Sequence, residues 1–356
     1  MAATADSIAA VQLDDGMIPW FEGGHADPWN HVEAAMALDA GGRRLEAEAA
    51  YQWLAATQRP DGAWHQYYLA GARVKEATLD ANVCAYVATG TWHHFLVTGD
   101  TGFLEESWPV VQRAVGFVVD LQTPGGEIIW ARHADGTPWP FALLTASCST
   151  YLSLRCALAI AARLDHERPQ WERAVAALGA AIVDRPHAFM PKHRWSMDWY
   201  YPVLVGAVSG EAAIERLAGG LHRFLLADVG VRCVADRPWV TAAETAECAM
   251  AHMAAGDHRR AHRLLAATRG LRHDDGSYFT GMVHPEQAHF PGGERTTYSA
   301  AAVVLATDAM SANTPTARLF GRAGPRASAS RVAARQRDEP ARVQHQAPIS
   351  RSACGE

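Results

Sequence analysis

The sequence predicts an all-α protein in which helical hairpins close into an (α/α)6 toroid. Apolar residues recur at helical spacing in most segments, and no segment shows sustained alternation of apolar and polar residues. Short turns, most containing Gly, recur roughly 45 to 65 residues apart, as expected for stacked hairpins that bury their faces only against their neighbours. These turns are Asp39-Ala40-Gly41-Gly42, Thr98-Gly99-Asp100, Leu164-Asp165-His166, Ser209-Gly210-Glu211 and Gly256-Asp257.

The helical pattern begins clearly at residue 28, where Asp27 is well placed as N-cap and Pro28 as the first helical residue. An inner helix needs two apolar faces and an outer helix one. We expect inner helices at 28–39, 78–98, 143–164, 198–209, 240–255 and 296–310. Outer helices are expected between them, at 43–58, 101–121, 169–184, 211–226 and 257–269. Ile128-Ile129-Trp130 is the only short strand that the pattern favours.

Three regions differ in patterning. Residues 1–18 are weakly patterned, so we expect a weakly ordered leader. Residues 19–310 form the toroid domain. From residue 311 to 356, Arg, Ala, Ser, Pro and Gln alternate without an apolar period, which predicts a disordered C-terminal tail.

Composition excludes several function classes. The net charge of −6 with no basic stripe argues against a nucleic-acid partner. No apolar stretch approaches the length that spans a membrane, and the N-terminus lacks the features of a signal peptide. The six cysteines form no CxxC pair, so we expect free thiols and a cytoplasmic location.

We expect neither a metal nor a cofactor. The sequence has no Gly-rich phosphate loop and no Gly-x-Ser-x-Gly motif. His93-His94 and the pair His258 and His262 have spacing close to that of metal ligands, but we expect them on solvated or outer helix positions, where a surface histidine is the better interpretation.

The loops that enter the inner helices are where we expect function. In a ring of helix pairs the N-termini of the inner helices converge on one face, here called the mouth. Loops placed there by a rigid scaffold commonly carry binding residues. Eight of the 12 Trp residues fall in these loops: Trp20, Trp29, Trp64, Trp130, Trp139, Trp195, Trp199 and Trp239.

Aromatic rings interleaved with carboxylates and Arg indicate a sugar-binding cleft, since pyranose rings stack on aromatic faces while their hydroxyls need polar partners. Three loop segments have this character: 20–29, 193–201 and 284–298. We therefore expect a small-molecule or oligosaccharide substrate.

The chain also resembles the six-hairpin glycosidases, a superfamily of glucoamylase-like α/α toroids, over about residues 19–310. The first hairpin carries Asp27-Pro28, Ala35-Met36-Ala37-Leu38, Gly41, Ala47-Glu48-Ala49, Trp53-Leu54, Gln58, Asp61-Gly62 and Tyr68-Leu69-Ala70-Gly71. The second carries Thr98-Gly99-Asp100, Phe103-Leu104 and Trp108-Pro109, and Pro285-Glu286-Gln287 followed by Tyr298-Ser299-Ala300-Ala301 is similar to the loop with the family's catalytic base. The resemblance implies that Asp27 holds sugar hydroxyls and that Glu286 is the general base of a glycoside hydrolase.

The chain departs from the family where the general acid is expected. The family has a Trp-Glu-Glu segment there, whereas this chain has Pro138-Trp139-Pro140-Phe141-Ala142, and Ala26 replaces the Arg that usually precedes the first Asp. Glycoside hydrolysis normally uses two carboxyl groups. The possible partners of Glu286 are Glu22, Glu76, Glu127, Asp135, Asp198 and Glu244, of which we favour Asp198 or Glu244.

The predicted substrate-binding residues are one carboxylate, one cation and four aromatic rings: Asp27, Arg295, Trp29, Trp139, Trp195 and Trp199. We expect Glu286, Asp27, Asp198 and Arg295 to converge on one pocket at the mouth.

A second resemblance gives an alternative function. Gln58 to Trp64 is similar to the Gln-Trp repeat of triterpene cyclases and protein prenyltransferase β-subunits, which are also α/α rings. The Asp-rich acid motif of the cyclases is absent, and no Asp, Cys and His set fits a Zn²⁺ site convincingly. The same motif has a structural use, in which it fastens a helix end to the next loop. A non-catalytic sugar-binding relative is the third alternative, because the expected acid segment lacks a carboxylate.

Overall fold

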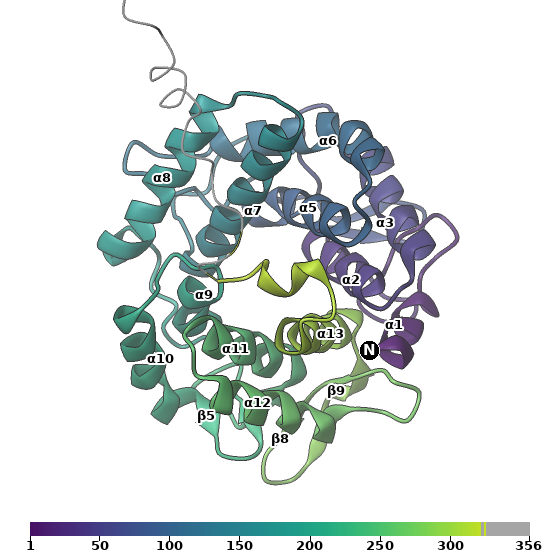
Figure 1. Ribbon diagram of the computed structural model, residues 1–356, viewed down its shortest axis with the longest axis vertical. Coiled ribbons are helices and arrows are strands. Elements are labelled where there is room, and N and C mark those ends of the chain that lie inside the picture. The colour runs from purple at the N-terminus through teal and green to yellow at the C-terminus, as the bar shows by residue number, and fades with distance from the viewer. Residues whose placement is uncertain (322–323, 325–356) are drawn as a thin grey trace, which may run out of the picture.

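The helices form a closed double ring, as predicted. The computed structural model describes residues 1–321 and 324. The inner ring consists of α2 (Pro28–Ala40), α4 (Ala81–Ala85) with α5 (Val87–Thr98), α7 (Leu144–Arg163), α9 (Met197–Leu204), α11 (Ala242–Ala254) and α13 (Thr297–Ser311). Each inner helix contacts the next, and α13 contacts α2, so the ring closes (Figure 1).

Outer helices surround this ring. Those in the described part of the chain are α1 (Ala2–Ala9), α3 (Arg44–Thr57), α6 (Thr101–Val119), α8 (Pro169–Asp184), α10 (Glu211–Phe224) and α12 (His258–Ala267). Outer helices bury one face only: in α12 the buried residues are Ala261 and Leu264. The inner helix α7 is buried nearly all round, as a helix with two packed faces must be.

The expectation of a weakly ordered leader is wrong for residues 2–9. This segment is α1, an outer helix, which buries Thr4, Ala5 and Ile8 and contacts α13 and α2. The helix is short and rich in Ala, so its apolar period spans little more than two turns, and packing against α13 stabilises what local propensity does not.

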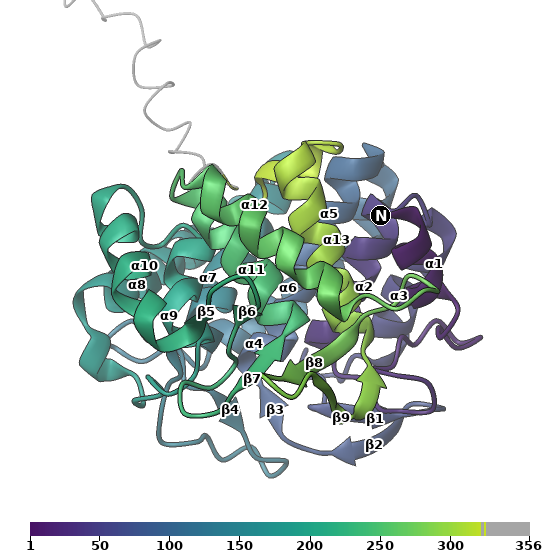
Figure 2. The same ribbon diagram turned by 90° about the horizontal axis from the view of Figure 1, so that it is seen from below.

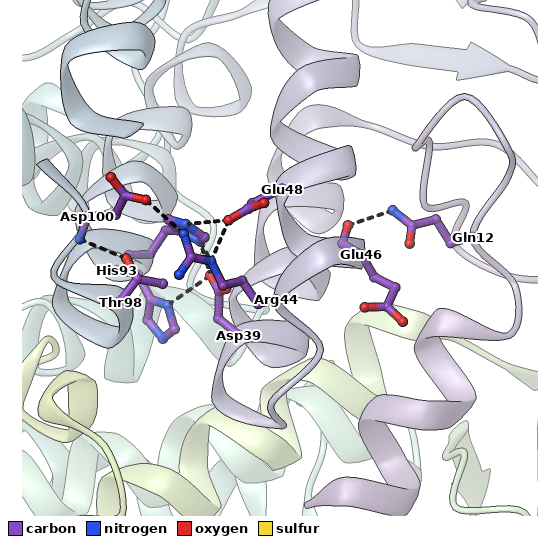
Figure 3. A network of polar contacts seen from close by, with 9 residues as sticks. Gln12, Asp39, Arg44, Glu46, Glu48, His93, Thr98 and Asp100 are labelled. Carbon is purple, nitrogen blue, oxygen red and sulfur yellow. Dashed lines mark hydrogen bonds and ion pairs between the residues drawn. The ribbon is translucent and has the colours of Figure 1, made fainter. Parts of the chain in front are cut away.

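Three glutamines fasten successive outer helices to one another. Each follows an outer helix and donates to two carbonyl oxygens, one four residues further on and one in the next outer helix. Gln12 donates to the Gly16 and Glu46 carbonyls at 3.0 and 2.9 Å (Figure 3 draws the second bond). Gln58 donates to Gly62 and Val110 at 3.0 and 2.9 Å. Gln122 donates to Gly126 and Ala174, both at 2.9 Å.

The glycine of each glutamine turn is required by geometry. Gly16, Gly62 and Gly126 have φ values of +92°, +88° and +97°, and a Cβ atom on any of them would lie within 2.5 Å of a backbone oxygen in the next outer helix. Gly276, with φ +94°, approaches the Ala3 carbonyl of α1 in the same way. The Gln58 motif therefore has the structural use that the sequence allowed, and α1 completes the outer ring.

The mouth carries the strands of the described residues. They are β1 (Tyr67–Leu69), β2 (Arg73–Glu76), β3 (Leu79–Asp80), β4 (Ala131–Arg132), β5 (Leu225–Leu226), β6 (Gly230–Val231), β7 (Trp239–Thr241), β8 (Phe279–Val283) and β9 (Ala288–Arg295). Figure 2 shows most of them along one face of the molecule. The sequence predicted a single strand at 128–130, and none of these strands covers it; they are too short and irregular for a period of two to be visible.

Neighbouring mouth loops are joined all the way round. Antiparallel pairing connects β3 to β4, and β8 pairs with β7 on one side and with β9 on the other. Single bridges join Ala26 to Tyr68, Ala142 to Phe189 and Trp195 to Val234. The Thr297 amide donates to the Trp20 carbonyl at 2.7 Å, which closes the circle. The side chains of the mouth therefore stand on a continuous rim.

The opposite face is covered by the segment after α13. Residues Pro315–Arg318 form a 3-10 helix that lies over the centre of the ring (Figure 1). The Asp308 carboxylate accepts hydrogen bonds from the Thr314 amide and from the Thr314 and Thr316 hydroxyls, at 2.8 to 3.0 Å. The Gly321 amide donates to the Leu204 carbonyl at 2.7 Å. The predicted disorder is therefore wrong for residues 311–321, while 322–323 and 325–356 lie outside the described residues.

His93 and His94 are buried at this face rather than solvated. The Asp39 carboxylate at the end of α2 lies 2.9 Å from His94 Nδ1 and 3.8 Å from His93 Nδ1. Glu48, Arg44 and Asp100 continue the network to the surface (Figure 3). The apolar period of α5 extends over both histidines, so the sequence pattern itself was compatible with burial.

Among the helices of the described residues, α7 is long and apolar enough to cross a membrane by length and composition alone. It is the buried inner helix of the third hairpin, packed against α4, α5, α8 and α9. Its hydropathy is explained by its place in the core.

We predict that Leu319→Ala lowers the free energy of unfolding by about 2–5 kcal/mol, the range for truncating a buried Leu. Leu319 directly follows the 3-10 helix and is 1% exposed. Leu45→Ala is the matched control, since Leu45 is 78% exposed and its truncation should change stability by less than about 0.5 kcal/mol. Denaturant unfolding of the three proteins measures the difference, and equal midpoints would show that the segment after α13 does not contribute to the fold.

Candidate active site

Asp27 stands at the mouth end of α2, as the sequence predicted. It caps the helix: its Oδ1 accepts from the Asn30 amide at 3.0 Å, and its Oδ2 accepts from Trp20 Nε1 at 2.6 Å and Asn30 Nδ2 at 2.7 Å. Burial raises the pKa of Asp27, and these hydrogen bonds oppose the shift. The carboxylate is thus held rigidly with donors that favour its ionised form.

Asp80 repeats this arrangement at the next inner helix. It caps α4 through the Asn82 and Val83 amides, and Trp130 Nε1 donates to its second oxygen. Burial raises the pKa of Asp80 to about 6, with a smaller contribution from the charge of Asp27. An Asp that caps an inner helix and accepts a hydrogen bond from a mouth Trp therefore occurs at two places in the ring.

Glu244 lies in the first turn of α11, half-buried at the mouth. Burial raises the pKa of Glu244, and the opposing hydrogen bond from Thr241 is smaller. Its charge acts on Tyr298, whose ring lies 5.1 Å from the ring of Trp20, the donor to Asp27. The ring pair of Trp20 and Tyr298 thus lies beside Asp27 and within the electrostatic range of Glu244.

Asp198 also lies at the mouth, in the first turn of α9. Its Oδ1 accepts from the Thr145 hydroxyl of α7 at 2.7 Å. Burial raises the pKa of Asp198, while Lys192 and Arg216 lower it by a smaller amount. Asp27, Asp198 and Glu244 thus occupy the first turns or caps of three inner helices, as predicted.

A pair of buried glutamates lies at the centre of the ring, beneath the mouth. Glu33 Oε1 accepts from Trp29 Nε1 at 3.1 Å and from the Tyr86 hydroxyl at 3.2 Å. Glu247 Oε1 accepts from the Tyr201 hydroxyl at 2.8 Å, and Tyr200 donates to the other oxygen.

The two glutamates also act on each other. Burial raises the pKa of Glu33 to about 7, with an added contribution from the negative charge of Asp27. Burial, followed by the charge of Glu33, raises the pKa of Glu247 well above its usual value. Sequence reasoning missed both residues, although an ionisable side chain inside the apolar run of an inner helix was a visible signal.

The predicted tryptophans divide into two groups. Trp29, Trp139 and Trp195 present part of their surface at the mouth, and Trp195 is 44% exposed. Trp199 is 7% exposed, donates through Nε1 to the Arg216 carbonyl at 2.8 Å and stacks on Phe224. Trp199 therefore packs the core between α9 and α10, and its prediction as a sugar platform is wrong because α9 turns its ring away from the mouth.

Glu286 and Arg295 do not lie with the other predicted site residues at the mouth. Glu286 is exposed at the turn between β8 and β9, and no described contact connects it with Asp27 or Glu244. Arg295 Nη1 lies 3.0 Å from both His273 Nδ1 and Ser277 Oγ and pairs with Asp275. The predicted convergence of Glu286 and Arg295 with Asp27 and Asp198 is therefore wrong in this structure, because pairing of β8 with β9 sets the direction of this hairpin.

The arrangement has the chemistry of acid–base catalysis. The charge of Asp27 raises the pKa of Asp80 and of Glu33, and the charges of Glu33 and Glu244 raise the pKa of Glu247, in each case after burial as the largest cause. Within residues 1–321 and 324, no three His, Cys, Asp or Glu side chains are arranged to hold a metal ion. Several carboxyl groups with raised pKa values, close to aromatic rings at one mouth, favour hydrolysis over an isoprenoid cavity or a lone binding carboxylate.

We predict that Glu33→Gln becomes more stable relative to the wild type as pH rises. A carboxyl with a higher pKa in the folded chain contributes stability at low pH, and this stability is lost between about 4.5 and about 7. The difference in unfolding free energy should grow by up to about 3 kcal/mol from pH 5 to pH 8, at about 1.4 kcal/mol per pKa unit. Thermal unfolding at both pH values measures it, with the exposed Glu105→Gln as control; a difference that stays constant would contradict the protonation of Glu33.

Comparisons with known proteins agree with this chemistry. No family model matches the chain. The chain is 52% identical over 317 residues, which is 89% of its length, to the MMP endo-(1,4)-3-O-methyl-α-D-mannosidase of Mycolicibacterium hassiacum, of which 88% is covered.

Solved structures show the same fold. A wild-type glycosidase superposes with a TM-score of 0.70 at 13% identity, over 86% of this chain and 95% of that one. The GH63 mannosylglycerate hydrolase from Thermus thermophilus gives a TM-score of 0.66 at 14% identity, over 85% of this chain and 98% of that one. The chain thus has the six-hairpin toroid, belongs to the family of the mycobacterial endo-mannosidase and is a glycoside hydrolase.

Proposed function

We propose that this enzyme cleaves internal α-(1→4) bonds in chains of 3-O-methyl-D-mannose. The observation that carries the proposal is the 52% identity over nearly the whole chain to a relative named for that specificity. A methyl ether replaces a hydroxyl donor with an apolar group, so such a chain suits a mouth rich in aromatic rings. The half-buried Trp29 and Trp139 and the exposed Trp195 are the proposed stacking surfaces.

We assign Glu244 as the general acid. An acid must hold its proton near neutral pH, and burial raises the pKa of Glu244 toward that range. Its first-turn position on α11 leaves it half-buried, so a sugar oxygen can reach it. Asp198 is the alternative acid, but the Thr145 hydroxyl occupies one of its oxygens.

We assign Asp27 as the base. Three N–H donors favour its ionised form and oppose the effect of its burial, whereas no comparable set surrounds Glu244 in the described part of the chain. In the proposed step, Glu244 gives its proton to the glycosidic oxygen as the bond from C1 to that oxygen breaks. Water forms the new bond to C1 and gives a proton to Asp27, and the two products are two shorter chains.

Glu286 remains the competing base, as the family resemblance implies. Its exposed hairpin would have to bring it over the substrate, while Asp27 already lies at the mouth. Arg295 pairs with Asp275, so we give it no part in the reaction.

We propose the cytoplasm as the site of action. All five cysteines among the described residues are free, and four of them are buried. Burial raises the pKa of Cys156 and of Cys233 to about 12, which keeps both as unreactive thiols.

We predict that the purified enzyme shortens α-(1→4)-linked 3-O-methylmannose chains to fragments of intermediate length, measured by mass spectrometry of the products. Unmethylated α-(1→4) mannose oligosaccharides are the control and should be cleaved more slowly, because they lack the apolar contact. Release of single sugars from one chain end, or equal rates on both substrates, would contradict the proposed specificity.

We predict that Glu244→Gln and Asp27→Asn each lower kcat by about 10²–10⁴-fold, since an amide neither gives nor takes the proton. Glu286→Gln should stay within a few-fold of the wild type, as should Glu105→Gln on the outer helix α6. Steady-state kinetics on one methylated substrate makes the comparison. A deep loss for Glu286→Gln with a small one for Asp27→Asn would make Glu286 the base.

A further inference from the structure

The buried glutamates connect four parts of the inner ring. Glu33 comes from α2 and Glu247 from α11, and they are 7% and 6% exposed. Tyr86, between α4 and α5, donates to Glu33, while Tyr200 and Tyr201 of α9 donate to Glu247. The space between these groups has a volume of about 10 Å³, no more than one water molecule needs. A sugar therefore does not fit in this space.

Trp29 connects the cluster with the mouth. It follows the cap residue Asp27 by two positions and is half-buried. Its Nε1 donates to Glu33 at 3.1 Å. Its ring lies edge-on to Tyr86 at 5.9 Å and to Tyr201 at 6.2 Å. The orientation of the indole is therefore determined by the buried side chains of Glu33, Tyr86 and Tyr201.

The groups that face the pair come from every inner element around it. The titratable ones are Asp27 of α2, Tyr86, Tyr200 and Tyr201, and Glu244 of α11. Helix α7 contributes the Ser149 hydroxyl, which has no hydrogen-bond partner among the described residues, and its Arg155 donates to the Val205 carbonyl. Ala302 and Leu305 of α13 and Phe320 complete the wall. The groups that donate to the two carboxyls are neutral hydroxyl and indole groups.

Two adjacent carboxylates among neutral donors carry an electrostatic cost that one proton removes. The raised pKa values of Glu33 and Glu247 agree with a proton held by the pair. With one proton the pair carries a single negative charge, so it accepts these hydrogen bonds and repels the ionised Asp27 less than two carboxylates would. The cluster then acts as a rigid support.

We propose that Glu33 and Glu247 are positioning residues that fix the Trp29 indole, and with it the sugar-binding surface beside Asp27. The role rests on the proposed function of the mouth. Stacking on Trp29 is felt in the ground state and the transition state alike, so loss of its orientation raises KM more than it lowers kcat.

The first test needs no substrate. In a nitrogen–proton spectrum of the tryptophan side chains, the Trp29 resonance is identified by its loss in Trp29→Phe. Glu33→Leu, which fills the space without an acceptor, should shift this resonance and speed its exchange with solvent at least tenfold. Glu33→Gln, whose amide oxygen still accepts, should leave it near its wild-type position.

Asp39→Ala is the matched control, because Asp39 is an equally buried carboxylate at the opposite end of the same helix (Figure 3). It should leave the Trp29 resonance unchanged. If Glu33→Leu does not fold, Tyr86→Phe takes its place in the test. This variant removes one donor to Glu33 and keeps the ring, so it should shift the Trp29 resonance by a smaller amount. An unchanged resonance in Glu33→Leu, or an equal change in Asp39→Ala, would overturn the proposal.

The second test is kinetic. Glu33→Leu should raise KM about tenfold or more with kcat within about threefold, and Glu33→Gln should restore KM. A wild-type enzyme that turns over no methylated mannan would remove the substrate proposal and leave the spectroscopic result standing. A wild-type KM in Glu33→Leu, together with normal turnover, would remove the positioning role alone.

Discussion

The hydrogen bonds that join successive outer helices are the constraint on which the mouth depends. Gln12, Gln58 and Gln122 each join the end of one outer helix to a carbonyl of the next. Each glutamine amide donates to one carbonyl of its own turn and to one carbonyl within the next outer helix. Because the adjacent glycines approach the neighbouring backbone closely, the outer helices take one fixed spacing. The loops that follow these helices therefore enter the inner ring at defined points.

That geometry places carboxyl groups in buried positions, where their charged forms lose solvation by water. Asp27, Asp80 and Glu244 stand at the N-terminal ends of inner helices, where helix dipoles favour negative charge. Burial nevertheless raises the pKa of each of them. The donors differ from site to site, however: Asp27 has three N–H donors, and Glu244 lies beside Tyr298 and Glu247. Different numbers of hydrogen-bond donors around similar carboxyl groups are the physical basis for giving one the role of acid and another the role of base.

The site was predictable only where it is tied to a helix. Asp27, Asp198 and Glu244 precede or begin inner helices, so the apolar period that located the helices also located these side chains. Glu286 and Arg295 lie in and beside a hairpin, whose direction follows from strand pairing that no periodicity reports. Trp199 begins an inner helix, but its ring fills a gap beside Phe224, and the packing of α10 decided that.

The sequence by itself determined the order and approximate bounds of the helices from α2 to α13, because each carries its own apolar face and most are separated by Gly or Asp turns. It predicted one helix at 78–98, where the structure has β3 followed by the two helices α4 and α5. It also placed the mouth, through the Trp-rich loops. Only the tertiary structure decided that residues 2–9 are an outer helix, that residues 315–318 cover the ring, and that Glu33 lies beside Glu247. These outcomes depend on contacts between segments more than 200 residues apart, such as α1 with α13 and α5 with the 3-10 helix Pro315–Arg318, and local sequence patterns hold no information about such contacts.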